Sequence, residues 1–220
     1  MARGCGLLSA IAARALFFIA CFTSLAAAVT SVEVVDAKGA PVENAVLSFY
    51  PVSGKAPPLS VKTVTVDQVD KEFLPEVTVV PMGTPVFFPN SDNIRHQLYS
   101  LSKAKNFEIP LYSGTPSTPI VFDKPGVVTL GCNIHDWMLA YIYVADTPYF
   151  VKTDSGGKAR IEGLKDEEYT MTVWHPRMKA AVKDTAKTVS ANGGAAIRIE
   201  LALKPDWRIR RAPVIGGGGY

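Results

Sequence analysis

The sequence predicts an all-β protein built from two β-sandwiches. Three observations support this fold class. Apolar and polar residues alternate with a period of two in several short runs, and turns that contain some of the 17 Gly and 16 Pro separate these runs. No segment beyond the N-terminal region carries a long apolar stripe at helical spacing, and at most one short helix is expected between Arg177 and Lys187. Alternating runs of this kind are typical of antiparallel strands in a sandwich.

The N-terminal residues 1–28 have the layout of a secretory signal peptide. Arg3 and Arg14 precede an apolar run, and Ala26, Ala27 and Ala28 provide a small-residue cleavage site. The run is too short for a comfortable membrane span, and no later segment has 18 unbroken apolar residues. We therefore expect a periplasmic or otherwise exported protein that begins near Val29, with no membrane span. A lipid anchor on Cys21 is the alternative.

Removal of this segment changes the charge and the cysteine count. The loss of Arg3 and Arg14 leaves 21 basic residues against 20 acidic ones, so the near-neutral protein gives no argument for nucleic-acid binding. Cys132 becomes the single cysteine. Since exported proteins normally pair their cysteines, this thiol is expected to be reactive, to bridge two chains or to bind a metal.

The strands are expected where the alternation is clearest. The alternating residues are Val32 and Val34; Val77 and Val79; Leu139, Tyr141 and Tyr143; Tyr169, Met171 and Val173; and Ile197, Ile199, Leu201 and Leu203. Turns with Gly or Pro are expected at residues 36–41, 81–85, 123–126, 153–158 and 192–194. Residues 53–58 are expected to form a linker, and residues 205–220 a flexible tail without periodicity.

Two separated segments resemble one known module. Residues 30–52 contain the pattern D-x-x-G-x-P-V-x-x-A, and residues 149–174 contain T-D-x-x-G, Gly-Leu and a strand around Tyr169. Both are similar to the carboxypeptidase regulatory-like (transthyretin-like) sandwich. We therefore predict that residues 29–60 and 147–204 form one sandwich, with a second domain at 61–146 inserted into one of its loops. The alternative is one larger sandwich of three strand groups.

A cluster of possible metal ligands lies near the end of the predicted insert. Cys132, His135 and Met138 follow one another at intervals of three residues, so one strand end and its loop can present them to one point. A further ligand must come from another strand, and His96 stands in front of a predicted strand. Two imidazoles and a thiolate in a plane, with a distant axial Met, suit copper that cycles between two oxidation states. A zinc site on the same Cys and His residues is also chemically possible.

The insert resembles a cupredoxin, the Greek-key sandwich of plastocyanin and amicyanin. The positions that carry the resemblance are Phe73, Pro75, Gly83, Val86, Phe88, Asn90, His96, Cys132, His135 and Met138. The C-x-x-H-x-x-M spacing is similar to the amicyanin ligand loop, and the chain also resembles exported proteins labelled methylamine utilisation proteins. The resemblance implies one copper per chain, bound by His96, Cys132 and His135 with Met138 axial. Gln97 departs from the Asn that often follows the first His, which puts the hydrogen bonding around the site in doubt.

Other interpretations of these residues remain open. Met138 can be a core residue, and Met82 and Met171 are expected in the core or in turns. His175 belongs to the flanking module and is expected at a surface or structural position.

The sequence favours a one-electron carrier that is not an enzyme. The expected partner is a redox protein such as a c-type cytochrome or a dehydrogenase. A module for copper delivery, storage or sensing is the alternative, although tracts rich in Met or His are missing from the sequence. Copper enzymes with a second metal site need more than the three His present, and attached haem needs a C-x-x-C-H motif that this chain lacks.

The exposed edge of the ligand loop is expected to meet the redox partner. The docking residues expected there are Asp136, Trp137 and Leu139, because apolar area around an exposed imidazole marks a contact site. The alternative for Trp137 is that it packs under the loop.

Overall fold

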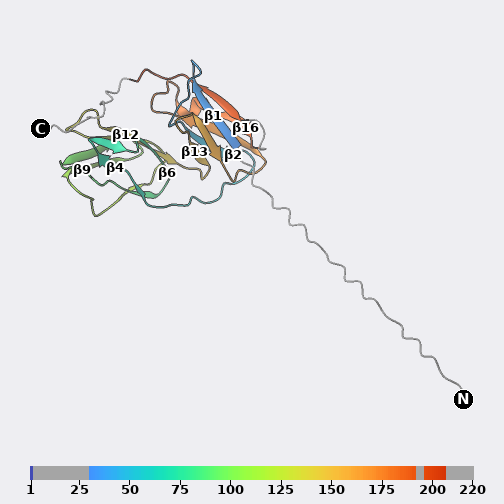
Figure 1. Ribbon diagram of the computed structural model, residues 1–220, viewed down its shortest axis with the longest axis horizontal. Coiled ribbons are helices and arrows are strands. Elements are labelled where there is room, and N and C mark those ends of the chain that lie inside the picture. The colour runs from blue at the N-terminus through green and yellow to red at the C-terminus, as the bar shows by residue number, and fades with distance from the viewer. Residues whose placement is uncertain (2–29, 192–195, 207–220) are drawn as a thin grey trace.

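The protein is an all-β molecule of two sandwiches joined side by side (Figure 1). The computed structural model describes residues 1, 30–191 and 196–206. Within these residues the strands are β1 (Thr30–Asp36), β2 (Val46–Pro51), β3 (Val64–Thr65), β4 (Asp67–Val69), β5 (Glu72–Leu74), β6 (Val77–Pro81), β7 (Thr84–Phe87), β8 (His96–Leu101), β9 (Asn106–Tyr112), β10 (Ile120–Phe122), β11 (Gly126–Gly131), β12 (Leu139–Ala145), β13 (Phe150–Lys152), β14 (Lys158–Ile161), β15 (Glu168–Trp174), β16 (Lys187–Ser190) and β17 (Ile197–Leu201). The predicted all-β class is confirmed.

The first sandwich combines the two ends of the described chain. One sheet has the order β14-β1-β17 and the other the order β13-β2-β15-β16. Apolar side chains from alternate positions of these strands point between the sheets, where Val34, Leu47, Phe49, Tyr169 and Met171 are fully buried. Burying aromatic and branched side chains supplies the main driving force for packing the two sheets.

The second sandwich consists of the strands from β3 to β12. Its larger sheet has the order β6-β12-β11-β8-β9, and it is packed against smaller sheets, β10-β7-β3 and β4-β5. Phe88, Leu98, Phe122, Leu130 and Ile142 are among its fully buried core residues. This sandwich carries the candidate metal ligands at one end.

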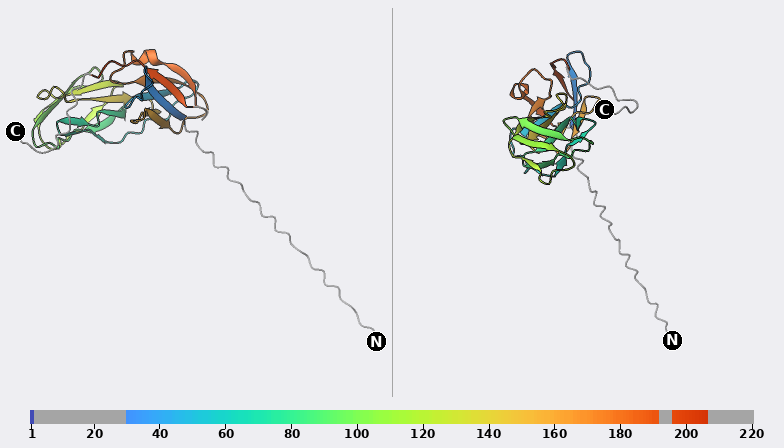
Figure 2. Two further views of the ribbon diagram at one scale, coloured as in Figure 1. Left: turned by 45° about the horizontal axis from the view of Figure 1, so that its top comes forward. Right: turned by 90° about the vertical axis from the view of Figure 1, so that its left-hand side faces the viewer.

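A third apolar cluster joins the two sandwiches. Val46 and Trp174 come from the first sandwich, whereas Val77, Tyr143 and Ala145 come from the second, and all five are buried. The Trp174 ring lies 5.7 Å from the Tyr141 ring and 5.6 Å from the Tyr143 ring. Figure 2 shows the resulting elongated body, with residues 30–52, 150–191 and 196–201 at one end and the intervening strands at the other.

Two turns show how the sequence fixes the strand ends. The Asp36 carboxylate accepts hydrogen bonds from the amides of Lys38 and Ala40, which closes the turn at 36–41. Gly157 has a φ of +71°, and a Cβ there would approach the carbonyl oxygen of Val34 to 2.4 Å. Only glycine fits this turn against β1.

The strand pairing differs from the expected antiparallel arrangement in three places. β1 pairs with β17, β6 with β12 and β3 with β7 in parallel, and the other pairs between these strands are antiparallel. The reason is that these partners belong to separate parts of the chain, so no tight hairpin sets their direction.

Several expectations fall on residues outside the described part. The signal peptide, the turn at 192–194 and residues 207–220 of the expected tail lie there. Within residues 30–191 and 196–206, the single helix is the short 3-10 helix Val182–Thr185, inside the range expected for a helix. None of the described helices has the length and apolar character needed to cross a membrane. The domain boundaries at residues 60 and 146 stay a prediction.

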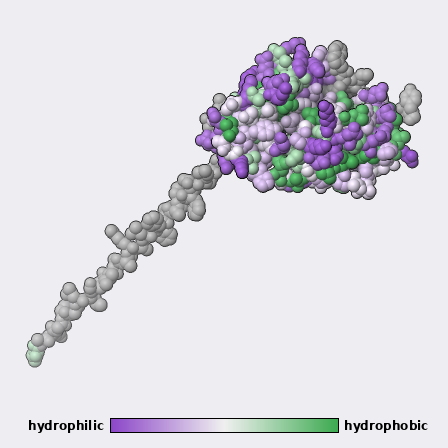
Figure 3. Space-filling model, turned by 180° about the vertical axis from the view of Figure 1, so that it is seen from behind, coloured by the Kyte–Doolittle hydropathy of each residue, from purple (hydrophilic) through white to green (hydrophobic). Residues whose placement is uncertain are grey.

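Hydrophilic and hydrophobic side chains share the rear face of the molecule. In Figure 3 the hydrophobic residues form several separate groups with hydrophilic residues between them. Such a mixed face is ordinary for a protein surface in contact with water.

Candidate metal centre

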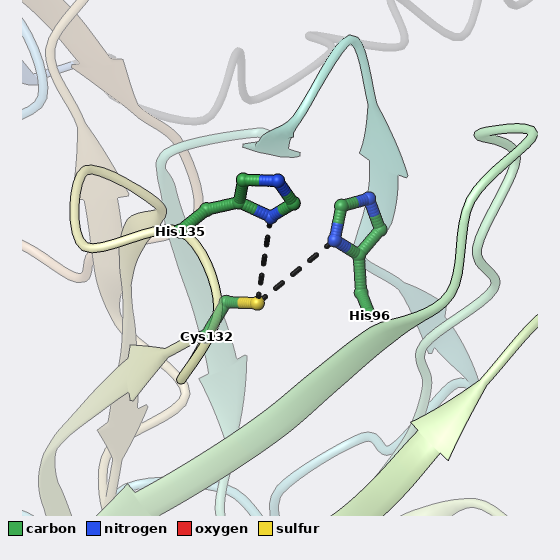
Figure 4. Close-up of side chains that lie close together, drawn as sticks. All are labelled: His96, Cys132 and His135. Carbon is green, nitrogen blue, oxygen red and sulfur yellow. Dashed lines mark hydrogen bonds between the residues drawn. The ribbon is translucent and has the colours of Figure 1, made fainter.

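Two neighbouring strands bring three of the predicted ligands together. Cys132 directly follows β11, His135 lies in the loop after it, and His96 is the first residue of β8. β11 and β8 are neighbours in the larger sheet, and Gly131 faces Tyr99 across them. As a result, residues 36 positions apart in the sequence meet at the end of the second sandwich (Figure 4).

The three side chains direct their donor atoms at a common point. Sγ of Cys132 lies 3.9 Å from Nδ1 of His96 and 3.9 Å from Nδ1 of His135, and the three donor atoms lie within 4.8 Å of one another. His96 and Cys132 are buried, whereas His135 is partly exposed. A first-row metal bound at about 2.3 Å to sulfur and about 2.0 Å to each nitrogen in a trigonal plane separates sulfur from nitrogen by about 3.7 Å and the two nitrogens by about 3.5 Å. The two sulfur–nitrogen distances of 3.9 Å therefore fit a single such ion.

Gly131 allows the ring of Tyr99 to cover the end of β11. A Cβ at position 131 would lie 2.9 Å from Cζ of Tyr99 and 3.0 Å from its hydroxyl oxygen. The absence of a side chain at Gly131 lets the Tyr99 ring from β8 lie against β11 beside Cys132. The Tyr99 ring therefore explains sterically why a glycine precedes Cys132.

Met138 lies in the same loop and is almost completely buried. It is the residue before β12, its side chain belongs to the same core cluster as Cys132, and its amide donates a hydrogen bond to the carbonyl of His135. Core packing of Met138 is therefore a feature of the structure. Its role as an axial ligand stays a prediction.

Asp92 forms a hydrogen bond with the His96 ring on the side opposite Cys132. This residue was not identified from the sequence. Oδ2 of Asp92 lies 2.7 Å from Nε2 of His96. Burial raises the pKa of the Asp92 carboxyl, but the hydrogen bonds that it accepts from His96 and from backbone amides outweigh burial and lower the pKa. The ionised carboxylate can accept only, so Nε2 of His96 carries the proton and Nδ1 presents its lone pair to Cys132.

The loop before His96 is rigidly supported. Asn90 accepts a hydrogen bond from the amide of Asp92, and its side-chain nitrogen donates to the carbonyls of Ile94 and Tyr112. The amides of Asp70 and Lys71 donate to the Asp92 carboxylate. An Asp four residues before a ligand His was the available signal for this contact in the sequence.

Trp137 links the ligand loop to the β4–β5 hairpin. Its ring lies 5.0 Å from the ring of His135, and its Nε1 donates a hydrogen bond of 3.1 Å to the carbonyl of Lys71. The ring is partly buried against the core of the second sandwich. Packing thus accounts for part of the Trp137 surface, whereas the neighbouring Asp136 and Ile134 are exposed and Leu139 is half-buried.

The remaining residues singled out from the sequence are not among the three grouped donors. Gln97 donates to Glu108 on β9 at 2.5 Å. Met171 is buried in the first sandwich, and Met82 packs against the core of the second. His175 belongs to the first sandwich and is 8% exposed.

Comparisons with known proteins give partial matches to solved structures. No protein-family model matches the chain, and no curated protein matches it. A Cu-containing nitrite reductase from Thermus scotoductus SA-01 is 31% identical over 43% of this chain, with a TM-score of 0.36, and the match spans 25% of that protein. A purple cupredoxin from Nitrosopumilus maritimus is 21% identical over 37% of this chain and 99% of its own length, with a TM-score of 0.33.

An amicyanin variant in its reduced Cu(I) form at pH 4 is similar to a comparable extent. It is 15% identical over 47% of this chain and 100% of its own length, with a TM-score of 0.35. All three similarities cover less than half of this chain at TM-scores below 0.5, so the functional argument rests on the geometry of the site itself. The resemblance of the flanking segments to a carboxypeptidase regulatory-like module stays a prediction.

Proposed function

We propose that the protein is an exported, mononuclear copper protein that carries one electron at a time. The observation that carries this proposal is the cluster of buried His96, buried Cys132 and partly exposed His135, positioned by two neighbouring strands and the loop after one of them. A thiolate with two imidazoles in a plane is the donor set of blue-copper electron-transfer sites. Met138, in the same loop, is the proposed axial ligand.

The surroundings of the cluster support rapid electron exchange. Asp92 fixes the ring of His96, and Trp137 packs against the ring of His135. Ligands held in this way move little when the metal changes its charge, which keeps the reorganisation small. His135 is the partly exposed ligand, so electrons are proposed to pass through its edge.

The proposed partner is a redox protein, such as a c-type cytochrome or a dehydrogenase. It would dock on Asp136, Trp137 and Leu139 beside His135. Exposed Asp136 favours a partner with Lys or Arg at the contact, and the half-buried Trp137 and Leu139 add apolar area. Small interfaces of this kind suit encounters that form and dissociate quickly.

A copper delivery, storage or sensing module is the alternative function. The same three donors would serve it, but one cluster from the described residues gives a capacity of a single ion. Catalysis at a second copper site is not proposed, because His175 is the one further His of the chain and it directly follows β15 of the first sandwich. Reversible one-electron cycling supports a carrier, whereas rapid loss of copper to a chelator supports delivery.

The decisive experiment is an absorption and EPR spectrum of the copper-loaded protein. We expect one Cu(II) per chain and an intense thiolate-to-copper band that Cys132→Ser abolishes, because the thiolate supplies the transferred electron density. Met138→Ala should shift the spectrum and raise the reduction potential while most of the copper remains bound. A coloured Cys132→Ser protein, or a native protein that takes up zinc and remains colourless in Cu(II), would contradict the proposal.

A further inference from the structure

A cleft between the two sandwiches opens beside the ligand loop. It has a volume of about 760 Å³, in the range of about 300–1,000 Å³ that ligand sites occupy. Asp136, Trp137 and Tyr141 contribute from the second sandwich, and Glu43, Arg177 and Asp206 contribute from the first and from the segment after it. An occupant of this cleft would therefore touch both sandwiches and the candidate metal loop at the same time.

The charge of the lining is strongly negative. The carboxylates in the lining are those of Asp36, Glu43, Glu76, Asp136 and Asp206. Arg177 is the cation among the described lining residues, and its guanidinium lies 3.6 Å from the carboxylate of Asp206. Burial, helped by the charge of Arg177, lowers the pKa of His175 to about 4, so this side chain is neutral at pH 7. The carboxylates thus outnumber the positive charges, and the cleft favours a cationic occupant.

The shape and the apolar part of the lining favour guanidinium groups in particular. The rings of Trp137 and Tyr141 and the prolines Pro41, Pro176 and Pro205 line the same cleft as the carboxylates. A planar guanidinium can stack on an aromatic ring and still form ion pairs at its edge. An ammonium group is more strongly hydrated and gains less from such surroundings.

The chain itself contains a segment rich in guanidinium groups directly after Asp206. Asp206 lies in the wall of the cleft, and the residues after it read Trp207, Arg208, Ile209, Arg210 and Arg211. Residues 207–220 contain these three arginines and no acidic residue. We propose that the cleft binds the arginine-rich segment 207–211 of the same chain.

Tethering favours this occupant over one from solution. A segment joined directly to the wall of its site has an effective concentration in the millimolar range, so weak ion pairs suffice to fill the site. The 14 residues after Asp206 can span at most about 46–50 Å, more than is needed to cross a cleft of this volume.

The cleft shares Asp136, Trp137 and Leu139 with the face proposed for the redox partner. The binding of the segment does not rest on the proposed electron-carrier function, since no metal takes part.

Limited proteolysis of the full-length chain tests the binding. Trypsin cleaves after Arg208, Arg210 and Arg211, and intact mass gives the rate of loss of the C-terminal residues. At low salt, Glu43→Gln/Asp136→Asn should be cleaved there about fivefold faster than the native protein, because two ion pairs of roughly 0.5 kcal/mol are lost. The control Glu162→Gln/Asp166→Asn removes two acidic residues outside the cleft lining and should be cleaved at the native rate.

Salt and concentration complete the test. High salt should raise cleavage of the native chain to the rate of the cleft variant, since screening weakens exposed ion pairs. Equal rates for the native chain and the cleft variant at low salt would overturn the proposal. Protection that increases with protein concentration would also overturn it, since a second copy would then be the occupant. The readout needs no copper, so a failed copper spectrum and a failed cleavage test are separate results.

Discussion

At the residue scale, Asp92 decides which nitrogen of His96 faces Cys132. Replacing it by Asn keeps the size of the side chain but removes the charge that favours a proton on Nε2. We expect Asp92→Asn to lower the affinity for copper about 10- to 100-fold, the usual effect of losing such a partner. Competition with a chelator of known affinity measures this change. Asp123→Asn, which removes an exposed carboxylate paired with Lys105, is the matched control and should bind copper as the native protein does. Unchanged affinity in Asp92→Asn would show that the loop alone orients His96.

His175 makes stability depend on pH. Its pKa is lowered by burial to about 4, whereas an unfolded His has a pKa of about 6.5. The folded state therefore binds the proton less well, so this contribution is complete above about pH 6.5 and declines as the pH falls toward 4. Over this window we expect the free energy of unfolding to fall by roughly 2–3 kcal/mol more in the native protein than in His175→Gln. Urea unfolding at several pH values measures both, and parallel curves would contradict the expectation.

The sequence pointed to the ligands more readily than to the residues that support them. The spacing of Cys132, His135 and Met138 is local, so one loop brings these residues together whatever the rest of the fold does. Asp92 reaches His96 because Asn90 fixes the intervening loop, and that hydrogen bonding depends on Tyr112 of a distant strand. Contacts such as the one between Asp92 and His96 depend on tertiary structure, so the sequence pattern alone indicates them only weakly.

At the element scale, the packing of the Tyr99 ring from β8 against the end of β11 depends on the missing side chain at Gly131. Gly131→Ala would place a Cβ 2.9 Å from Cζ of Tyr99 and 3.0 Å from its hydroxyl oxygen, so the end of the Tyr99 side chain must move aside. We expect a loss of about 1–3 kcal/mol in the free energy of unfolding. In a Tyr99→Ala background the same substitution should cost much less, because the obstructing ring is gone. A double-mutant cycle by urea unfolding measures the coupling, and strictly additive losses would contradict the steric explanation.

The alternation of residues in β12 indicates a strand, but it does not show which parts of the molecule pack against each of its two faces. Tyr141 and Tyr143 were among the alternating residues, yet the core of the second sandwich contains Ala140, Ile142 and Val144. Tyr143 is instead buried in the cluster that joins the sandwiches. A period of two assigns residues to two faces, and the packing of a neighbouring unit decides whether the second face is also covered.

At the scale of the whole molecule, the joining cluster limits how separable the two sandwiches are. We expect that replacing Val61 to Ala145 by a short Gly/Ser bridge leaves a folded remnant, because the first sandwich has its own buried core. The bridge can be short, since the Tyr50 hydroxyl donates to the Asp146 carboxylate at 2.6 Å. Exposure of Val46 and Trp174 should lower its stability by about 3–6 kcal/mol. Circular dichroism during urea unfolding measures this, and a remnant without a cooperative transition would show that the two parts depend on one core.

The parallel pairing of β1 with β17 sets an order in which a growing chain can complete its parts. β1 has its sheet partners at residues 158–161 and 197–201, so the first of the described strands cannot pair until the last of them, β17, has been synthesised. β8, β11 and β12 have all of their partners once residue 145 has been made. A ribosome that has reached Ala145 has thus already synthesised every side chain of the candidate metal centre, whereas the sandwich that contains β1 still lacks its closing strands.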